Sequence, residues 1–394
     1  MLSTALNIED VRKQARRRLP RGIFDYIDRG AEDEVGLARL RRSFDDLAFH
    51  PRVLVDVSRR DLSTRLFGRE RPLPLVIAPT AAAGLVWHQG EIELARAAAK
   101  AGIPFTIATG SMTEMERIAT EARGELWFQL YMWHARELSH ALIDRAWANG
   151  IETLVLTVDT VANPIREYNA RNGYEVPIRA SLKGGLDMLA HPRWVGGVLL
   201  RYLLDEGIPT YRHYPESFRS SITRKATWEQ VRLTDAMGWD DLKDLRRRWP
   251  GRLILKGVLR ADDAARAVEA GVDGIVVSSH GARNLDAAVP PVRALPAIVE
   301  AVRGRAAVLA DSGVKRGADV LKLMALGADA VLIGRAPLYG TAIAGEAGAS
   351  HVLRLLRQEM EAVMGFLGCA SLDELDTSFI STEGDRQERP FAGN

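Results

Sequence analysis

The 394-residue sequence lacks several features that would assign it to a functional class. Its single cysteine, Cys369, excludes an internal disulfide and a cysteine-based metal cluster, and is typical of a reducing compartment. The motifs HEXXH, paired CxxC and the Walker phosphate loop are missing, so neither a metal site nor nucleotide hydrolysis is indicated. The net charge is only +2, so the composition does not indicate a nucleic-acid partner.

Long apolar runs are also missing. No stretch of about 18 apolar residues is uninterrupted, so no membrane span is predicted. Residues 1–19 have no apolar core ahead of a cleavage site, and we expect no secretory signal. With 47% hydrophobic and 26% charged residues, the composition is that of a folded globular protein rather than a disordered one.

From residue 75 onward, short apolar runs alternate with amphipathic stretches. Stretches such as 91–102, 261–271 and 316–327 have apolar residues three and four apart, and each closes with a glycine. Eight alternating units predict an α/β fold, a parallel (β/α)8 TIM barrel. An open doubly wound sheet is the alternative, but its G-x-G-x-x-G turn is absent. The expected strands are 75–80, 104–109, 126–131, 153–159, 253–258, 274–279, 306–312 and 330–335.

One domain spanning 1–394 is predicted, with additions to the barrel at 75–345. Residues 1–70 form an N-terminal helical segment, with helical patterning over 7–47 and Asn7 as a cap, and 346–394 form a C-terminal helix and tail. More than ninety residues separate the fourth and fifth strands, where about twenty would suffice. They include an expected helix at 238–248 and an insertion, 177–215, on the side where barrel enzymes place their chemistry.

Polar and charged side chains stand where the last predicted strands end. The carboxyl ends of barrel strands converge on one mouth, so these residues are interpreted as a set. After the seventh and eighth strands, backbone N–H groups and basic side chains commonly hold a phosphate; ordinary solvated turns are the alternative. The candidates here are Asp311, Gly313, Lys315, Gly334 and Arg335.

Two further strand ends carry ionisable groups. Lys256 must meet an anion, form a Schiff base or face the N1–C2=O edge of a flavin, and a structural ion pair is a further alternative. His280 follows the sixth strand, and Asp159 at another strand end would fix its tautomer and raise its basicity. The alternative is a hydrogen-bonded loop histidine. Arg283 and Arg166 would bind an anionic substrate. The set predicts an enzyme that acts on a small carboxylate with a phosphorylated cofactor.

On these motifs the chain resembles the FMN-dependent α-hydroxy-acid dehydrogenase/oxidase family. The resemblance covers essentially the whole chain, and the SHGxRxLD segment is highly specific. Within the family the chain is most similar to the membrane-associated mandelate and lactate dehydrogenases. The motifs follow in the family's order: FDYIDRGAEDE (24–34), PLVIAPTA (74–81), LWFQLY (126–131), LVLTVD (154–159), LILKGV (253–258), SSHGARNLD (278–286), DSGVKRGADV (311–320) and GADAVLIGRAPLYG (327–340).

The resemblance implies oxidation of an (S)-2-hydroxy acid, mandelate-like or lactate-like, to the 2-keto acid, with FMN as cofactor. His280 would then be the base, oriented by Asp159, as hydrogen passes to flavin N5 either as hydride or through a carbanion. The substrate would be bound by Tyr26, Tyr131, Arg166 and Arg283, with Tyr131 on its hydroxyl side. The cofactor would be bound by Pro79, Thr80, Ala81, Gln129, Thr157, Lys256, Ser278, Asp311, Gly313, Lys315, Gly334 and Arg335.

Several positions depart from the family pattern. Lys315 replaces the more usual arginine, so a single ammonium charge takes the place of a bidentate guanidinium at the phosphate. Ala108 replaces a common flavin-contacting serine. The expected electron acceptor is a membrane quinone. Ala81 supports the alternative, an oxidase that reduces O2 to H2O2, because mandelate-type dehydrogenases tend to carry glycine at this position and oxidases alanine. A Schiff-base lyase using Lys256 and a non-catalytic flavin protein are more distant alternatives. Small and apolar residues expected to shape room for an aryl group are Ala82, Ala83, Gly84, Trp87 and Met132.

The insertion predicts contact with a membrane surface. Residues 176–226 hold eight basic residues against four acids, around the run WVGGVLLRYLL (194–204). This run is too short and too charged to span a bilayer but suits an interfacial patch, and a lid or subunit contact is the alternative. With the resemblance, we expect a cytoplasmic homotetramer, peripheral on the inner face of the cell membrane. The basic residues are Arg179, Lys183, Arg193, Arg201, Arg212, Arg219, Arg224 and Lys225, and the acids are Asp187, Asp205, Glu206 and Glu216.

Overall fold

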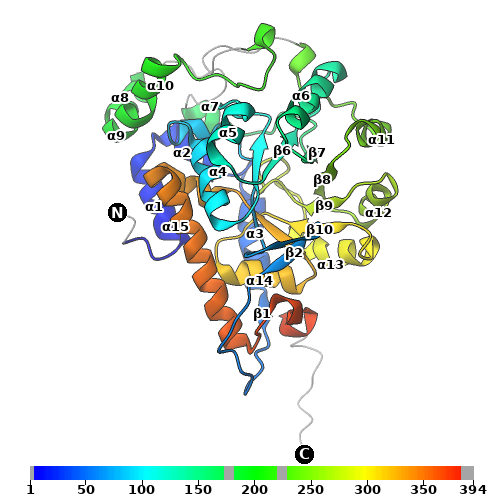
Figure 1. Cartoon of the computed structure of the whole chain (residues 1–394). Helices are drawn as coiled ribbons and strands as arrows, with labels where there is room; N and C mark the ends of the chain where they lie inside the picture. The colour runs from blue at the N-terminus through cyan, green and yellow to red at the C-terminus, as the bar shows by residue number, and fades with distance from the viewer. Residues whose placement is uncertain (1–3, 173–181, 220–228, 383–394) are drawn as a thin grey trace, which may run out of the picture.

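The computed structural model describes residues 4–172, 182–219 and 229–382, and its centre is a closed eight-stranded barrel (Figure 1). All neighbouring barrel strands pair in parallel, and the last strand pairs with the first, Val331 opposite Leu75. The predicted (β/α)8 barrel is therefore confirmed and the open sheet is wrong. The strands are β4 (Leu75–Ile77), β5 (Phe105–Ala108), β6 (Leu126–Leu130), β7 (Thr153–Thr157), β8 (Arg252–Val258), β9 (Gly274–Val277), β10 (Ala307–Ala310) and β11 (Ala330–Ile333).

The strands are apolar throughout because both of their faces are buried. Alternate residues such as Val155 and Ile254 fill the barrel interior, and their neighbours pack against the outer helices. The hairpin of β2 (Thr64–Leu66) and β3 (Arg69–Arg71) adds Leu66 to the interior cluster and places Phe67 against Trp127. The outer helices are α4 (Gly90–Ala101), α5 (Met115–Ala122), α6 (Arg136–Ala148), α11 (Trp239–Arg248), α12 (Ala261–Glu269), α13 (Pro291–Val302), α14 (Gly317–Ala325) and α15 (Arg335–Leu367).

The N-terminal segment folds as three helices, α1 (Ile8–Arg18), α2 (Arg21–Asp28) and α3 (Val35–Asp45). Asn7 caps α1 as predicted, because its side-chain oxygen accepts a hydrogen bond from the amide of Asp10. The carboxylate of Asp286 accepts hydrogen bonds from the amides of Val35 and Gly36 at the start of α3. This contact joins the N-terminal segment to the loop after β9. At the other end, β1 (Leu47–Phe49) pairs with β12 (Ile380–Thr382).

The C-terminal helix α15 has a break at Ala344 and Gly345, where the backbone leaves the helical region. Its first part begins directly after β11, and the helix packs on α1, α4 and α14. Two short helices, η6 (Leu372–Glu374) and η7 (Thr377–Phe379), lead from α15 to β12. The C-terminal segment therefore closes over the same side of the barrel as the N-terminal helices.

The interval between β7 and β8 is built from short helices at the top of the view in Figure 1. They are α7 (Glu167–Asn172), α8 (Leu182–Leu189), α9 (Pro192–Trp194), the π-helix η3 (Val195–Leu199), α10 (Leu200–Asp205), η4 (Glu216–Phe218) and η5 (Glu229–Val231). Residues 177–181 of the predicted insertion, with Arg179, and the basic pair Arg224 and Lys225 lie outside the described residues. Within the described ranges, no helix combines the length and apolar character that a bilayer crossing requires.

Candidate active site

A cavity of about 700 Å³ opens at the carboxyl ends of the barrel strands, beneath the N-terminal helices. All residues predicted to be catalytic, substrate-binding or cofactor-binding line it except Asp159 and Ser278. Those two bond directly to lining residues, Asp159 to His280 and Ser278 to Lys256. The structure thus brings together groups from eight strand ends and from α2, as a barrel mouth does.

His280 and Asp159 form a hydrogen-bonded pair at one side of this cavity. The Nδ1 of His280 lies 2.9 Å from Oδ1 of Asp159, and its Nε2 lies 3.3 Å from the hydroxyl of Tyr131. Burial favours the neutral carboxyl, but His280 and Lys256 outweigh it and lower the pKa of Asp159 to about 2. An ionised carboxylate only accepts hydrogen bonds, so Nδ1 of His280 carries a proton, and Nε2 lies on the side of the Tyr131 hydroxyl.

The turn that carries His280 has a left-handed backbone. His280, Gly281 and Ala282 have φ angles of 54°, 64° and 57°. The hydroxyl of Ser278 accepts a hydrogen bond from the amide of His280, and the hydroxyl of Ser312 accepts one from the amide of Gly281. Such conformations cost free energy and persist only where surrounding contacts impose them, often at functional sites.

Two arginines, Arg166 and Arg283, lie next to each other in the wall of the cavity. The guanidinium of Arg166 donates to the carbonyl oxygen of Arg283 at 2.6 and 3.0 Å. Arg283 donates to the carbonyl of Arg29 and lies 5.2 Å from the ring centre of Tyr26. Burial and the nearby charge of Arg283 lower the pKa of Arg166 to about 10. Two partly buried positive charges close together favour an anionic ligand.

Lys256 is buried and ion-paired at the base of the site. Its Nζ lies 3.2 Å from Asp311 Oδ2 and donates to Ser278 Oγ at 2.9 Å. Burial lowers the pKa of Lys256, but Asp311 and Asp159 raise it more, and the net pKa lies above its usual value. A Schiff base requires a neutral amine, so this environment disfavours the lyase alternative.

The turn after β10 and the end of β11 form the other end of the cavity. Ser312 and Gly313 have φ angles of 76° and 90°, and a Cβ at Gly313 would lie 3.1 Å from Phe44. The guanidinium of Arg335 donates to the carbonyl of Gly281 at 2.8 Å, and burial lowers the pKa of Arg335. With Lys315 also lining this end, the cavity is basic where a phosphate was predicted.

Buried polar atoms in the cavity wall test whether FMN fits. Thr80 Oγ1, Thr157 Oγ1, Gln129 Nε2 and Arg335 Nε are buried and have no hydrogen-bond partner among the described residues. Such groups normally need a partner, since burying one without a hydrogen bond is costly. They are spread from the β4 end to the basic end, between apolar lining such as Ala108. A flavin ring with hydrogen-bonding edges, a ribityl chain and a phosphate matches this donor set.

The prediction of the residues that shape the space for the substrate's side chain is wrong. Ala82, Ala83, Gly84, Trp87 and Met132 do not line the cavity. The chain turns away from the mouth after Ala81, so the three small residues are buried behind the wall, and Met132 belongs to the outer core. Trp87 instead packs against the guanidinium of Arg18, 4.8 Å from the ring centre.

Other lining residues were missed by the sequence analysis. Thr160, Pro164 and Leu233 line the cavity. Thr160 could have been found from its place beside Asp159. Leu233 follows η5 and reaches the site through an isolated bridge to Trp133, which no local pattern indicates. Ser312, whose hydroxyl donates to Asp311 at 2.6 Å, was also missed despite being its neighbour.

Comparisons with known proteins agree with this site. A family model described as FMN-dependent dehydrogenase matches residues 15–382. (S)-Mandelate dehydrogenase of Pseudomonas putida is 40% identical over 390 residues, which cover 99% of this chain and 97% of that protein. L-Lactate dehydrogenase of Xanthomonas euvesicatoria pv. vesicatoria is 41% identical over 374 residues, 94% of this chain and 95% of that protein.

Solved structures are similar over the same span. A crystal structure of the monotopic membrane protein (S)-mandelate dehydrogenase has a TM-score of 0.91 at 39% identity and covers 96% of this chain and 100% of that chain. A structure of mandelate oxidase with 3,3-difluoro-2-hydroxy-3-phenylpropionic acid has a TM-score of 0.77 at 34% identity, over 96% and 99% of the two chains. The chain therefore belongs to the FMN-dependent dehydrogenase family, and the residues of its cavity fit the cofactor FMN.

Proposed function

We propose that this protein oxidises an (S)-2-hydroxy acid to the 2-keto acid. The observation that carries the proposal is that His280, hydrogen-bonded to Asp159, lines the same cavity as Arg166 and Arg283, and that this cavity fits FMN. A base and two carboxylate-binding arginines in one cavity suit a small molecule with a hydroxyl next to a carboxylate. We propose mandelate-like over lactate-like substrates on the similarity to solved structures of mandelate dehydrogenase and mandelate oxidase, and the L-lactate dehydrogenase at 41% identity keeps lactate as the alternative.

In this proposal His280 takes a proton from the substrate on Nε2. The ionised Asp159 holds the proton on Nδ1 and stabilises the imidazolium that forms. Tyr131 remains protonated, because burial and the negative charge of Asp159 raise its pKa to about 12. Its hydroxyl, 3.3 Å from Nε2, is therefore available as a hydrogen-bond donor at the substrate's hydroxyl side.

The remaining residues hold charge. Arg166 and Arg283 bind the substrate carboxylate, with Tyr26 beside them. FMN, when bound, supplies the acceptor for the two electrons removed from the substrate. Lys256 keeps a buried positive charge on the wall of the cavity, held by Asp311. Lys315 and Arg335 neutralise phosphate charge at the basic end.

Anaerobic mixing of the holoenzyme with a panel of hydroxy acids tests the proposal. We expect (S)-mandelate to bleach the flavin absorbance faster than L-lactate, glycolate or a long-chain hydroxy acid. His280→Asn should retain FMN and lose bleaching by about 10³-fold or more. If no hydroxy acid bleaches the wild-type flavin, the proposal is wrong. If lactate is fastest, only the mandelate preference is wrong.

The electron acceptor is proposed to be a membrane quinone. Ala81, which lines the cavity, favours the alternative, an oxidase that reduces O2 to H2O2. Similarity to both a dehydrogenase and an oxidase is compatible with either acceptor. Turnover with a soluble quinone analogue in air discriminates them. Peroxide in amounts equal to the keto acid would support the oxidase, and quinone reduction with little peroxide would support the dehydrogenase.

A peripheral membrane contact through the insertion is part of the proposal. The predicted run divides into two faces: Trp194, Val198 and Tyr202 are buried against the barrel, whereas Leu200, Leu203 and Leu204 are exposed at helical spacing. Four more exposed residues extend the apolar surface or border it with charge, namely Leu186, Leu189, Ile208 and Arg201. An exposed face of several leucines with an arginine beside it suits the interface of a bilayer.

Flotation with vesicles containing phosphatidylglycerol measures this contact. The double variant Leu203→Ser and Leu204→Ser should lose flotation, while Leu285→Ser, an exposed leucine far along the chain, should not. Wild-type protein that stays at the bottom of the gradient would refute the membrane contact and leave a lid or subunit interface. The location on the inner face of the cell membrane and the homotetramer are proposed from the family resemblance, and sedimentation velocity measures the latter.

A further inference from the structure

Glu91 is a buried carboxylate that the proposed chemistry does not use. It is the second residue of α4, its exposed fraction is 1%, and it does not line the cavity. Burial raises the pKa of Glu91. A buried ionisable group is costly, so its contacts need an explanation.

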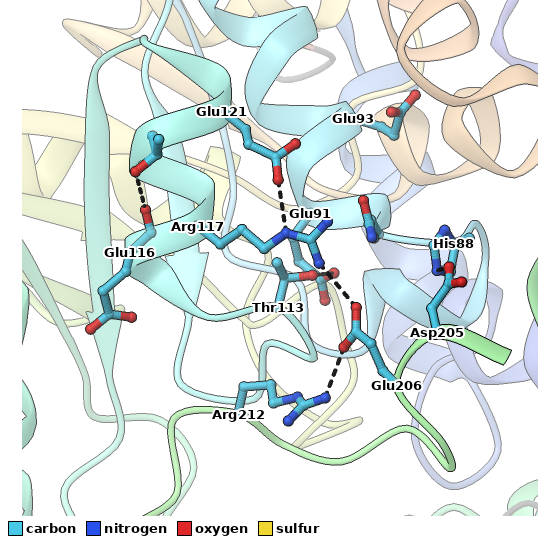
Figure 2. Close-up of polar contacts among 12 residues, drawn as sticks. His88, Glu91, Glu93, Thr113, Glu116, Arg117, Glu121, Asp205, Glu206 and Arg212 are labelled. Carbon is cyan, nitrogen blue, oxygen red and sulfur yellow. Dashed lines mark hydrogen bonds and ion pairs between the residues drawn. The ribbon is translucent and has the colours of Figure 1, made fainter. Parts of the chain in front are cut away.

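The carboxylate joins two loops at the mouth of the barrel. Oε1 accepts hydrogen bonds from the amide of Gly84 at 3.2 Å, in the loop after β4, and from the amide of Met112 at 3.1 Å, in the loop after β5. Oε2 accepts from the hydroxyl of Thr113 at 3.0 Å, and Figure 2 shows these two side chains together. Glu91 therefore ties the loop after β4 to the loop after β5.

These two loops meet at the cavity wall. The amide of Ala82 donates to the carbonyl of Gly110 at 3.1 Å, and a Cβ at Gly110 would lie only 2.9 Å from the Cβ of Ala81. Ala81 lines the cavity. The loop after β5 begins at Thr109, whose hydroxyl accepts a hydrogen bond from the amide of Tyr131. A shift of either loop therefore moves Ala81, and a shift of the second also disturbs the end of β6.

The insertion also contacts the loop after β4. The hydroxyl of Tyr202 accepts the amide of Gln89 at 3.1 Å, and a Cβ at Gly84 would lie 2.5 Å from this hydroxyl. Beside it, Glu206 accepts hydrogen bonds from Arg117 at 3.0 Å and Arg212 at 2.8 Å (Figure 2). The loop after β4 is thus held between Glu91 inside and α10 outside, with little room to adjust.

We propose that Glu91 is a positioning residue for the substrate site. Through its hydrogen bonds to the two loops it holds Ala81, a residue of the cavity wall, in place and so determines how tightly the cavity binds its substrate. This inference rests on the proposed hydroxy-acid oxidation and adds a positioning role for a group outside the cavity.

The test compares Glu91→Ala with Glu91→Gln in the holoenzyme. Alanine leaves three buried donors without an acceptor, whereas glutamine offers its oxygen to both amides and its amino group to the Thr113 hydroxyl. For Glu91→Ala we expect the KM for (S)-mandelate to rise about tenfold or more with kcat within about threefold, because small displacements at a binding wall weaken substrate positioning. Glu91→Gln should restore the KM to within about twofold of wild type.

A matched control is Asp329→Ala, which removes a carboxylate–amide hydrogen bond to Val308 at the opposite end of the barrel. Its KM should match wild type. A wild-type KM in Glu91→Ala, or a KM in Glu91→Gln as high as in Glu91→Ala, overturns the proposal. If Glu91→Ala does not fold, Thr113→Val decides: a raised KM supports the role and an unchanged KM overturns it.

Hydrogen–deuterium exchange separates this inference from the proposed function. The amides of 80–90 and 109–116 should exchange faster in Glu91→Ala and not in Glu91→Gln. This measurement needs no turnover, so it holds even if no hydroxy acid reduces the flavin. Unchanged exchange in Glu91→Ala would show that the carboxylate does not hold the loops.

Discussion

Asp159→Asn removes one charge from the site while keeping the shape of the side chain. The carboxylate is mostly buried and lies 2.9 Å from His280. Burial opposes its ionisation, yet His280 and Lys256 lower the pKa of Asp159 from 3.8 to about 2. This difference corresponds to about 2.5 kcal/mol in favour of the ionised form in the folded state.

The sign of the stability effect follows from the lowered pKa. A carboxylate with a depressed pKa contributes stability above its unfolded value near 3.8, and the contribution is lost as the pH falls toward 2. Asp159→Asn should therefore be less stable than wild type by about 2 kcal/mol at pH 7. Urea unfolding should show this difference narrowing below about pH 4.

The effect on the reaction should be larger than the effect on stability. Asparagine can donate to Nδ1 and so favours the tautomer with the proton on Nε2, which cannot act as a base. A correctly oriented general base contributes about 10²- to 10⁴-fold to a rate, and the wrong tautomer of His280 forfeits most of that contribution. We therefore expect flavin reduction by (S)-mandelate to slow by about 10²- to 10³-fold with FMN retained.

Stopped-flow absorbance under anaerobic conditions measures this rate at saturating substrate. The control is Asp240→Asn, whose carboxylate on α11 is 94% exposed. It should reduce flavin at the wild-type rate. A rate for Asp159→Asn within about threefold of wild type, with full FMN content, would refute the role of the Asp159–His280 pair.

Three further substitutions test the packing of the site. Gly257→Ala places a Cβ 2.7 Å from that of Asp159 at a backbone φ of 110°. Thermal unfolding should therefore show a loss of about 2–3 kcal/mol in the free energy of unfolding, and flavin reduction should slow. A variant as stable as wild type would contradict the crowding. Lys256→Met leaves Asp311 without its cation, and urea titration should show a loss of about 3 kcal/mol, whereas a loss below about 1 kcal/mol would mean that the pair is well solvated. Gly281→Ala meets Arg335 at 2.6 Å and should weaken FMN binding by about tenfold in fluorescence titrations; an unchanged Kd would show that Arg335 can move away without loss.

Local pattern determined the architecture of this protein. Continuous apolar strands such as 153–157 alternate with helices, and a strand buried on both faces has few options other than a parallel sheet. Because barrel geometry brings carboxyl ends together, His280, Asp159 and Lys256 could be grouped before their positions were known. The motif resemblance then supplied roles that residue types alone left open.

Tertiary structure decided which partner each group meets. The Lys256–Asp311 ion pair and the Arg166 hydrogen bonds to the Arg283 carbonyl join residues more than fifty positions apart. Tertiary contacts also place Leu233 in the cavity, bury Tyr202 while its neighbour Leu203 is exposed, and hold Glu91 between two loops. Local sequence sets the conformation and polarity of a segment, but the contact between two segments depends on how the whole barrel closes. That is why the strand ends could be identified from the sequence, while the contacts of Glu91 behind Ala81 could not.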